Sequence, residues 1–191
     1  MTQNSTKQSG KGLEDSFFAR QSEELRLRMK EEMDAANKRE ALATTLEIQS
    51  EPLLDNLLAA GIEVETMPAL SMIPLVAVGW ADETMHSKQQ AAILEAAAEQ
   101  GIREDHTSHF LLLSWLAQKP DTALFGTWLQ YVQTLAPTWE EARRAEFIGK
   151  MMERSRRVAE AYSGLLGLRK VNKAEAAILQ TIEASVNTSD Q

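Results

Sequence analysis

Asp82, Glu83 and His86 place two carboxylates and an imidazole in one short segment, the residue types that bind divalent metal ions. An imidazole suits Zn²⁺, Ni²⁺ or Cu²⁺, whereas Ca²⁺ prefers about six to eight oxygen ligands. Gln89, one turn further on, offers only a neutral oxygen. We therefore expect a weak metal site at most, and we favour the alternative in which His86 is a turn or cap residue.

A second group with metal-binding residue types contains His106 and His109, whose spacing puts two imidazoles on the same face of a helix. Two ligands do not complete a site, and no third His or Cys lies near them in the sequence. We expect an ordinary exposed helix start here. The sequence shows neither a phosphate-binding loop nor a nucleophile paired with a base, so we expect no enzyme and no cofactor.

Composition and net charge bear on which partners and which compartment to expect. The chain has 191 residues, of which 43% are hydrophobic and 25% charged, as in an ordinary globular protein. Its net charge is -8, and an acidic protein repels the phosphate backbone of nucleic acids. It has no cysteine and no continuous apolar stretch that is long enough to span a membrane. We expect a cytoplasmic protein with no nucleic-acid partner and no membrane span.

Residues 13–46 predict one long, highly charged helix with a narrow apolar stripe. The stripe consists of residues at helical spacing, Phe18, Leu25, Met29, Met33 and Ala36. Such a stripe lies either across a groove of its own domain or against a partner helix. We favour another chain, either a different protein or a second copy, and we predict that it binds Phe18, Leu25, Met29 and Met33.

Helical spacing of apolar residues continues along the chain, and alternating strand patterns are absent. We therefore predict an all-α fold of about eight helices. The expected divisions are a disordered tail (1–12), an N-terminal helical extension (13–62), a compact helical domain (67–186) and a disordered C-terminal tail (187–191). Glu63 to Thr66 is the expected linker between the extension and the domain.

Cap and turn residues predict where the helices begin and end. A short helix should start at Ser50 with Pro52 in its first turn and end at Gly61, and Pro74 should lie in the first turn of the next helix or kink it. Further helices are expected from Ser87 to about Glu99, from Asp105 to Ala117, from Thr122 to Leu135 with Asp121 as cap, from Thr138 to Tyr162, and from Asn172 to Val186.

The four tryptophans could line a ligand pocket or pack in the core. Trp80, Trp115 and Trp128 stand at helical spacing among apolar residues, so we expect them in the core. Trp139 should pack against a helix end.

An internal repeat links two of the expected helices. Residues 79–94 and 164–179 share the sequence Ala-Ala-Ile-Leu at their ends, and each copy enters its helix through a polar tetrad. The tetrads, Ser87-x-x-Gln90 and Asn172-x-x-Glu175, combine a hydrogen-bond acceptor with a longer side chain that can reach back to the helix start. The repeat predicts architecture rather than chemistry.

Five short segments carry a resemblance to a protein family. They are IPLVAVGWAD at 73–82, AAIL at 91–94, SWLAQKP at 114–120, VAEAYSGLLG at 158–167 and KAEAAIL at 173–179. Together they resemble the tellurite-resistance TerB-like family, in particular an uncharacterised bacterial branch with a long N-terminal helix.

The resemblance covers about residues 67–186. It implies a bundle of repeated helical hairpins, acidic metal-binding residues in the turns, and a loose link to stress response. Two departures weaken the implied metal site: Glu83 replaces the glycine of the family turn Trp-Ala-Asp-Gly, and Gln89 stands where the family has a glutamate. We favour a non-enzymatic helical protein-interaction module. The alternative is a metal-responsive domain that uses the turn from Asp82 to His86.

Overall fold

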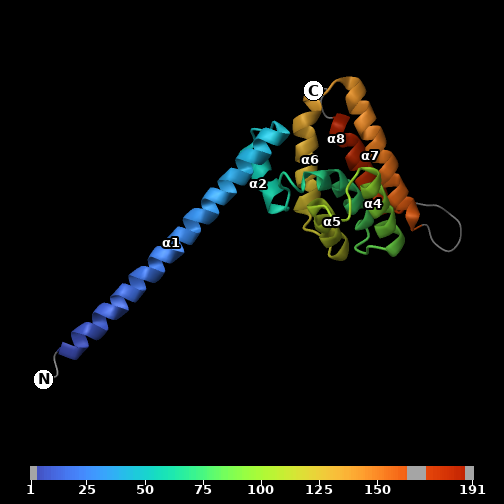
Figure 1. The fold of residues 1–191 in the computed structure, drawn as a ribbon. Coiled ribbons are helices and arrows are strands. Elements are labelled where there is room, and N and C mark those ends of the chain that lie inside the picture. The colour runs from blue at the N-terminus through green and yellow to red at the C-terminus, as the bar shows by residue number, and fades with distance from the viewer. Residues whose placement is uncertain (1–3, 163–170, 188–191) are drawn as a thin grey trace.

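The computed structural model describes the backbone of residues 4–162 and 171–187 and, within these ranges, the side chains of residues 20–186 apart from Ser22. This part of the chain consists of eight α-helices and two short 3-10 helices, with no strand. The first helix projects from a bundle that the other helices form (Figure 1). The prediction of an all-α fold with about eight helices is confirmed.

The projecting helix is α1 (Asn4–Leu46), which begins inside the stretch that we expected to be a tail. Its last turns are anchored in the bundle, where Leu42 and Leu46 are buried. Two ion pairs hold the same turns, Lys38–Glu63 and Arg39–Asp55. Because Glu63 also belongs to the expected linker, that segment is tied to α1 rather than free.

The next helix, α2 (Glu51–Ala59), follows Ser50 and carries Pro52 in its first turn, as predicted. It ends at Gly61, whose φ of 79° lies in the left-handed region that favours glycine. The chain then folds back, so that the Ile62 N–H donates to the Leu57 carbonyl at 2.9 Å. The core of the bundle includes Leu57, Ile62 and Leu42, so the expected extension and the expected domain share one core.

Pro74 lies in the first turn of α3 (Ile73–Gly79), directly after the 3-10 helix η1 (Met67–Met72). In that position its missing N–H costs no helical hydrogen bond. The helix α3 is the centre of the bundle, because most of its residues are buried and it packs against α6, α7 and α8. At Gly79 an added Cβ would lie 2.7 Å from the end of the Met85 side chain, so a larger residue there would require Met85 to move.

The remaining elements surround α3. They are α4 (Ser87–Glu99), α5 (Thr107–Ala117), α6 (Ala123–Leu135), the 3-10 helix η2 (Ala136–Thr138), α7 (Glu141–Ala161) and α8 (Lys173–Asn187). The long helix α7 packs along α3, α4 and α8. The C-terminal tail expected at 187–191 lies almost entirely outside the described residues.

Two of the predicted helix starts in the bundle differ from the structure by two residues or more: α5 begins at Thr107 rather than Asp105, and α7 at Glu141 rather than Thr138. The helix α7 begins at Glu141 after the cap residue Glu140, because the Thr138 hydroxyl donates to the Leu135 carbonyl instead of capping a helix. Asp121 does cap α6, since its Oδ1 accepts the Ala123 N–H at 2.7 Å.

The tryptophans lie largely where their spacing predicts. Trp128 and Trp115 belong to the core, with 1% and 6% of their surface exposed, and Trp80 is partly buried against it. Trp139 packs edge-on against Phe147 of α7, with the ring centroids 4.9 Å apart. The interpretation of these indoles as packing residues is therefore confirmed for Trp115 and Trp128.

Candidate functional site

The two helix starts of the internal repeat face each other at one end of α3. Both α4 and α8 pack against this helix, and the chain passes from its last residue through a short turn into α4. Five polar residues meet there, and we call them the turn junction: Asp82, His86, Gln89, Asn172 and Glu175.

Gln89 and Glu175 form the buried centre of the turn junction, with 1% and 4% of their surface exposed. The Gln89 Nε2 donates to the Glu175 Oε1 at 3.0 Å. Each side chain uses its remaining oxygen to cap its own helix. The Gln89 Oε1 accepts the His86 N–H at 3.2 Å, and the Glu175 Oε2 accepts the Asn172 N–H at 2.8 Å. One amide and one carboxylate therefore cap two helix starts and join them.

Asp82 and Asn172 extend the network toward solvent. The Asn172 Oδ1 accepts the Glu175 N–H at 2.9 Å, and its Nδ2 donates to the Asp82 Oδ2 at 3.5 Å. The same Asp82 oxygen lies 3.9 Å from the His86 Nε2. Side-chain and backbone contacts thus link the five residues in a ring that connects the two repeat copies.

Tyr162 covers one face of the His86 ring. The two ring centroids lie 3.4 Å apart and the ring planes differ by 4°, which is a stacked arrangement. Tyr162 follows the last residue of α7 and precedes residues 163–170, which lie outside the described residues. Sequence spacing gave no signal for this contact, because the two residues come from different helices.

Burial raises the pKa of the Glu175 carboxyl above its ordinary value. The negative charge of Asp82 adds to the increase, whereas the hydrogen bonds from Asn172 and Gln89 oppose it. The carboxylate is therefore costly to keep ionised, although both of its oxygens have hydrogen-bond donors.

The structure brings only two of the three predicted metal ligands together. Asp82 and His86 are neighbours in the turn junction, whereas Glu83 pairs with Lys119. Across the described residues, no group of three His, Cys, Asp or Glu side chains is arranged to hold a metal ion.

The oxygen atoms of the turn junction are also occupied. Every side-chain oxygen of its five residues accepts an N–H, including the Asp82 Oδ1, which accepts the Thr84 N–H at 3.3 Å. A hard cation prefers several charged or carbonyl oxygens around one point, whereas the buried centre of the turn junction supplies one carboxylate, Glu175, beside the neutral amide of Gln89. The residues present therefore do not fit the metal that the family resemblance implies.

The repeat seen in the structure is shifted by one residue relative to the repeat in the sequence. The polar tetrad of α4 runs from His86 to Gln89, one residue before the predicted pair Ser87 and Gln90, and that prediction was wrong. The second tetrad is Asn172 to Glu175, as predicted. In each copy the next buried residue lies four positions after the last member of the tetrad, which makes Ile93 equivalent to Leu179. An alignment on the shared Ala-Ala-Ile-Leu sequence instead makes Ile93 equivalent to Ile178.

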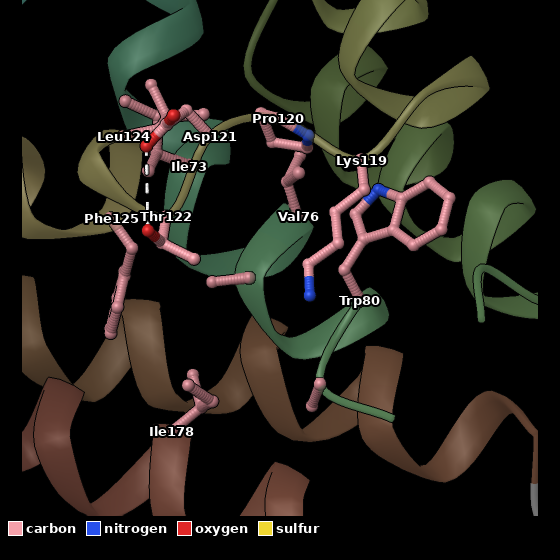
Figure 2. Close-up of a pocket in the computed structure, with 12 residues that line it drawn as sticks. Ile73, Val76, Trp80, Lys119, Pro120, Asp121, Thr122, Leu124, Phe125 and Ile178 are labelled. Carbon is pink, nitrogen blue, oxygen red and sulfur yellow. Dashed lines mark hydrogen bonds between the residues drawn. The ribbon is translucent and has the colours of Figure 1, made fainter. Parts of the chain in front are cut away.

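An apolar cavity of about 280 Å³ lies next to the turn junction, between α3, α6 and α8 (Figure 2). Trp80 and Phe125 lie on opposite sides of it, and Lys119 and Asp121 supply the charged groups at its rim. The Trp80 indole N–H donates to the Trp115 carbonyl at 2.8 Å, so it is not free to recognise a ligand. The cavity can accept a small apolar group.

The predicted partner-binding residues lie on the projecting part of α1. We call residues 20–38 the arm. Leu25, Met29 and Met33 are 60%, 54% and 64% exposed, and Ala36 is also exposed. Phe18 is helical, but its side chain lies outside the described side chains. The bundle therefore leaves the described part of the apolar stripe, from Leu25 to Ala36, uncovered.

The second histidine pair is separate from both sites. His106 precedes α5, and its Nδ1 accepts the Arg103 N–H at 3.4 Å. His109 packs edge-on against Phe110 with the ring centroids 6.4 Å apart. His109 is partly buried, and its Nδ1 has no hydrogen-bond partner among the described residues.

Comparison of the chain with known protein families, curated proteins and solved structures found no match. The resemblance to the TerB-like family therefore stays a prediction from the sequence. In the described part of the chain, no helix is both long enough and apolar enough to cross a membrane.

Proposed function

We propose that the protein is a non-enzymatic interaction module of the cytoplasm, which presents the arm of α1 to another protein chain. The observation that carries the proposal is the uncovered stripe on the arm: Leu25, Met29 and Met33 are each more than half exposed. Figure 1 shows α1 extending well beyond the bundle, so the arm is accessible from all sides.

An isolated helix is marginal in water, and most helical stability in proteins comes from packing of an apolar face. A stripe of large apolar side chains on a projecting helix therefore favours association with a second surface. The same charged residues that make the arm soluble surround the stripe with both signs of charge. This arrangement is typical of a helix that pairs with another helix.

The stripe continues toward the bundle. Ala36 and Ala43 follow Met29 at spacings of seven, which keeps the three residues on one face of the helix. Ala36 is exposed, whereas Ala43 packs against the core. A partner that runs along the stripe would therefore reach the bundle at Ala43, and its binding surface would include both parts of the molecule.

Leucines on opposite faces of the arm allow a matched test. Leu25 belongs to the stripe, and Leu27, which is 52% exposed, lies about 160° around the helix from it. We expect Leu25→Glu to lower the mass of the complex measured by light scattering, or to abolish capture of its partner. Leu27→Glu makes the same chemical change on the other face and should leave both measurements unchanged.

The proposal fails if the two variants behave alike, or if the parent chain is monomeric at high concentration and captures no partner. Circular dichroism of both variants should match the parent, because neither leucine touches the bundle. A role in stress response rests on the family resemblance alone. The metal-responsive alternative has less support, because Gln89 is a neutral amide and Glu83 pairs with Lys119 instead of joining Asp82 and His86.

A further inference from the structure

The contact between Gln89 and Glu175 joins the two halves of the bundle at one buried point. The residues are 86 positions apart, and each is the last member of the polar tetrad that starts its helix. They are the two buried polar side chains of the turn junction. Any change in the charge of either group must therefore be balanced inside the protein.

The hydrogen bonds of this pair are complementary only because one member is an amide. The Gln89 Oε1 accepts from its own helix start, which leaves Nε2 to face the Glu175 Oε1 at 3.0 Å. A glutamate at position 89 would place an oxygen where Nε2 now lies. Two buried carboxylate oxygens at that distance repel each other unless a proton or a cation lies between them.

We propose that the Gln89 amide takes the place of a bridging cation in the turn junction, so that the two repeat copies are joined without any metal ion. The donor is covalently part of the chain and is always present. The junction therefore closes in the same way whatever the divalent cation concentration, and Gln89→Glu converts it into a cation-dependent contact.

Asp82 defines where such a cation would bind in the variant. Its Oδ2 lies within hydrogen-bonding distance of Asn172, which also caps the Glu175 helix. Asp82 is partly exposed, so it can turn toward a cation held by two carboxylates at positions 89 and 175. In the parent chain this oxygen meets Asn172 and His86 instead.

The test compares the melting midpoint Tm of the full-length parent and three variants, each in chelator and in millimolar Ca²⁺ or Mg²⁺. In chelator, Gln89→Glu should lower Tm by about 6 °C or more, because it leaves a buried charge without a partner. Ca²⁺ should raise the Tm of this variant in a saturable way. The parent should melt at the same temperature in all conditions.

Gln90→Glu is the matched control. It adds the same charge one residue later in the first turn of α4, where a carboxylate is favourable to the helix dipole, and it leaves the hydrogen bond from Gln89 to Glu175 in place. Its Tm should stay within about 2 °C of the parent, with no response to cations.

The double exchange Gln89→Glu with Glu175→Gln keeps one amide and one carboxylate but swaps their positions. Both helix starts can still be capped, and the new Nε2 at position 175 can donate to the new carboxylate at 89. We expect this variant to regain most of the Tm that Gln89→Glu loses, without added metal.

Three results would each overturn the inference. The first is a saturable Tm increase of the parent with Ca²⁺ or Mg²⁺. The second is a Gln89→Glu variant that is as stable in chelator as Gln90→Glu, or that gains nothing from Ca²⁺. The third is a double exchange that melts no higher than Gln89→Glu alone. If the single variant does not fold, the double exchange and the parent still decide the question.

Discussion

Glu83 pairs with Lys119 at the rim of the apolar cavity while its own backbone is in the left-handed region, with a φ of 67°. A residue with a Cβ is strained there by about 1–2 kcal/mol. The Glu83 side chain is 76% exposed, and an exposed ion pair contributes only about 0–1 kcal/mol. The backbone strain at Glu83 therefore lowers stability by more than the ion pair with Lys119 raises it.

Replacing Glu83 by glycine should stabilise the protein by about 0.5–1 kcal/mol, because glycine adopts a positive φ without strain. Part of the gain is offset by the greater freedom of glycine in the unfolded chain. Urea unfolding followed by tryptophan fluorescence measures the change. Glu83→Ala removes the same ion pair and keeps the strain, so it should be less stable than Glu83→Gly. The reverse order would contradict this account.

Trp128 is the largest fully buried side chain of the described residues, and it stacks on Phe125 with ring centroids 5.9 Å apart. Trp128→Ala should cost about 3–5 kcal/mol in the free energy of unfolding, because it leaves a large cavity in the core. Trp139→Ala is the comparison, since Trp139 is only partly buried and its loss should cost less. A Trp128 variant as stable as the Trp139 variant would remove Trp128 from the core.

The helices and their ends were largely predictable, because the signals are local. Apolar residues at helical spacing predicted the core face of α6 with Trp128. The glycine at position 61 predicted the end of α2, because glycine readily adopts the positive φ that it has there. Asn172 and Glu175 were found because both partners of a capping box lie in one tetrad. The periodicity also located the stripe with Leu25, although it did not decide whether the bundle covers it.

The turn junction was not predictable, because its decisive contact is between distant residues. Gln89 was noted only for what it cannot do as a metal ligand, and its partner Glu175 was expected only as a cap. Ser87 is the better cap by residue type, yet α4 starts after His86 because this register buries Gln89 and Ile93 together. Packing between helices therefore overrode local preference, and the shared Ala-Ala-Ile-Leu sequence suggested the wrong register.

The raised pKa of Glu175 makes its contribution to stability depend on pH. A carboxyl group whose pKa is higher in the folded state than in the unfolded state stabilises the fold fully at low pH. That contribution is lost as the pH rises from the ordinary value of 4.5 through the higher folded value. The parent should therefore lose stability relative to Glu175→Gln as the pH rises above 4.5.

Urea unfolding of both proteins at several pH values measures this difference, and comparison with the variant removes the contributions of all groups that do not interact with Glu175. The Glu175→Gln variant keeps a side chain of the same shape but replaces one of the two accepting oxygens with a donor. The cost of that lost hydrogen bond does not depend on pH, so the pH dependence of the difference still reports the ionisation of Glu175. A difference that stays constant with pH, or that favours the parent more strongly at pH 7, would mean that burial does not dominate at Glu175.

A deletion that ends at residue 35, within the arm, should leave the bundle intact, whereas a longer deletion should not. A chain without residues 1–35 keeps Lys38 and Arg39 with their ion pairs and loses no side chain that is described as buried, so its Tm should stay within about 4 °C of the parent. A chain without residues 1–48 also loses Leu42, Leu46 and Ile48, which are buried in the core. Each buried leucine contributes about 2–5 kcal/mol, so this deletion should destabilise the bundle severely. Calorimetry of the two deletions compares them directly, and equal midpoints would show that the end of α1 is not part of the core.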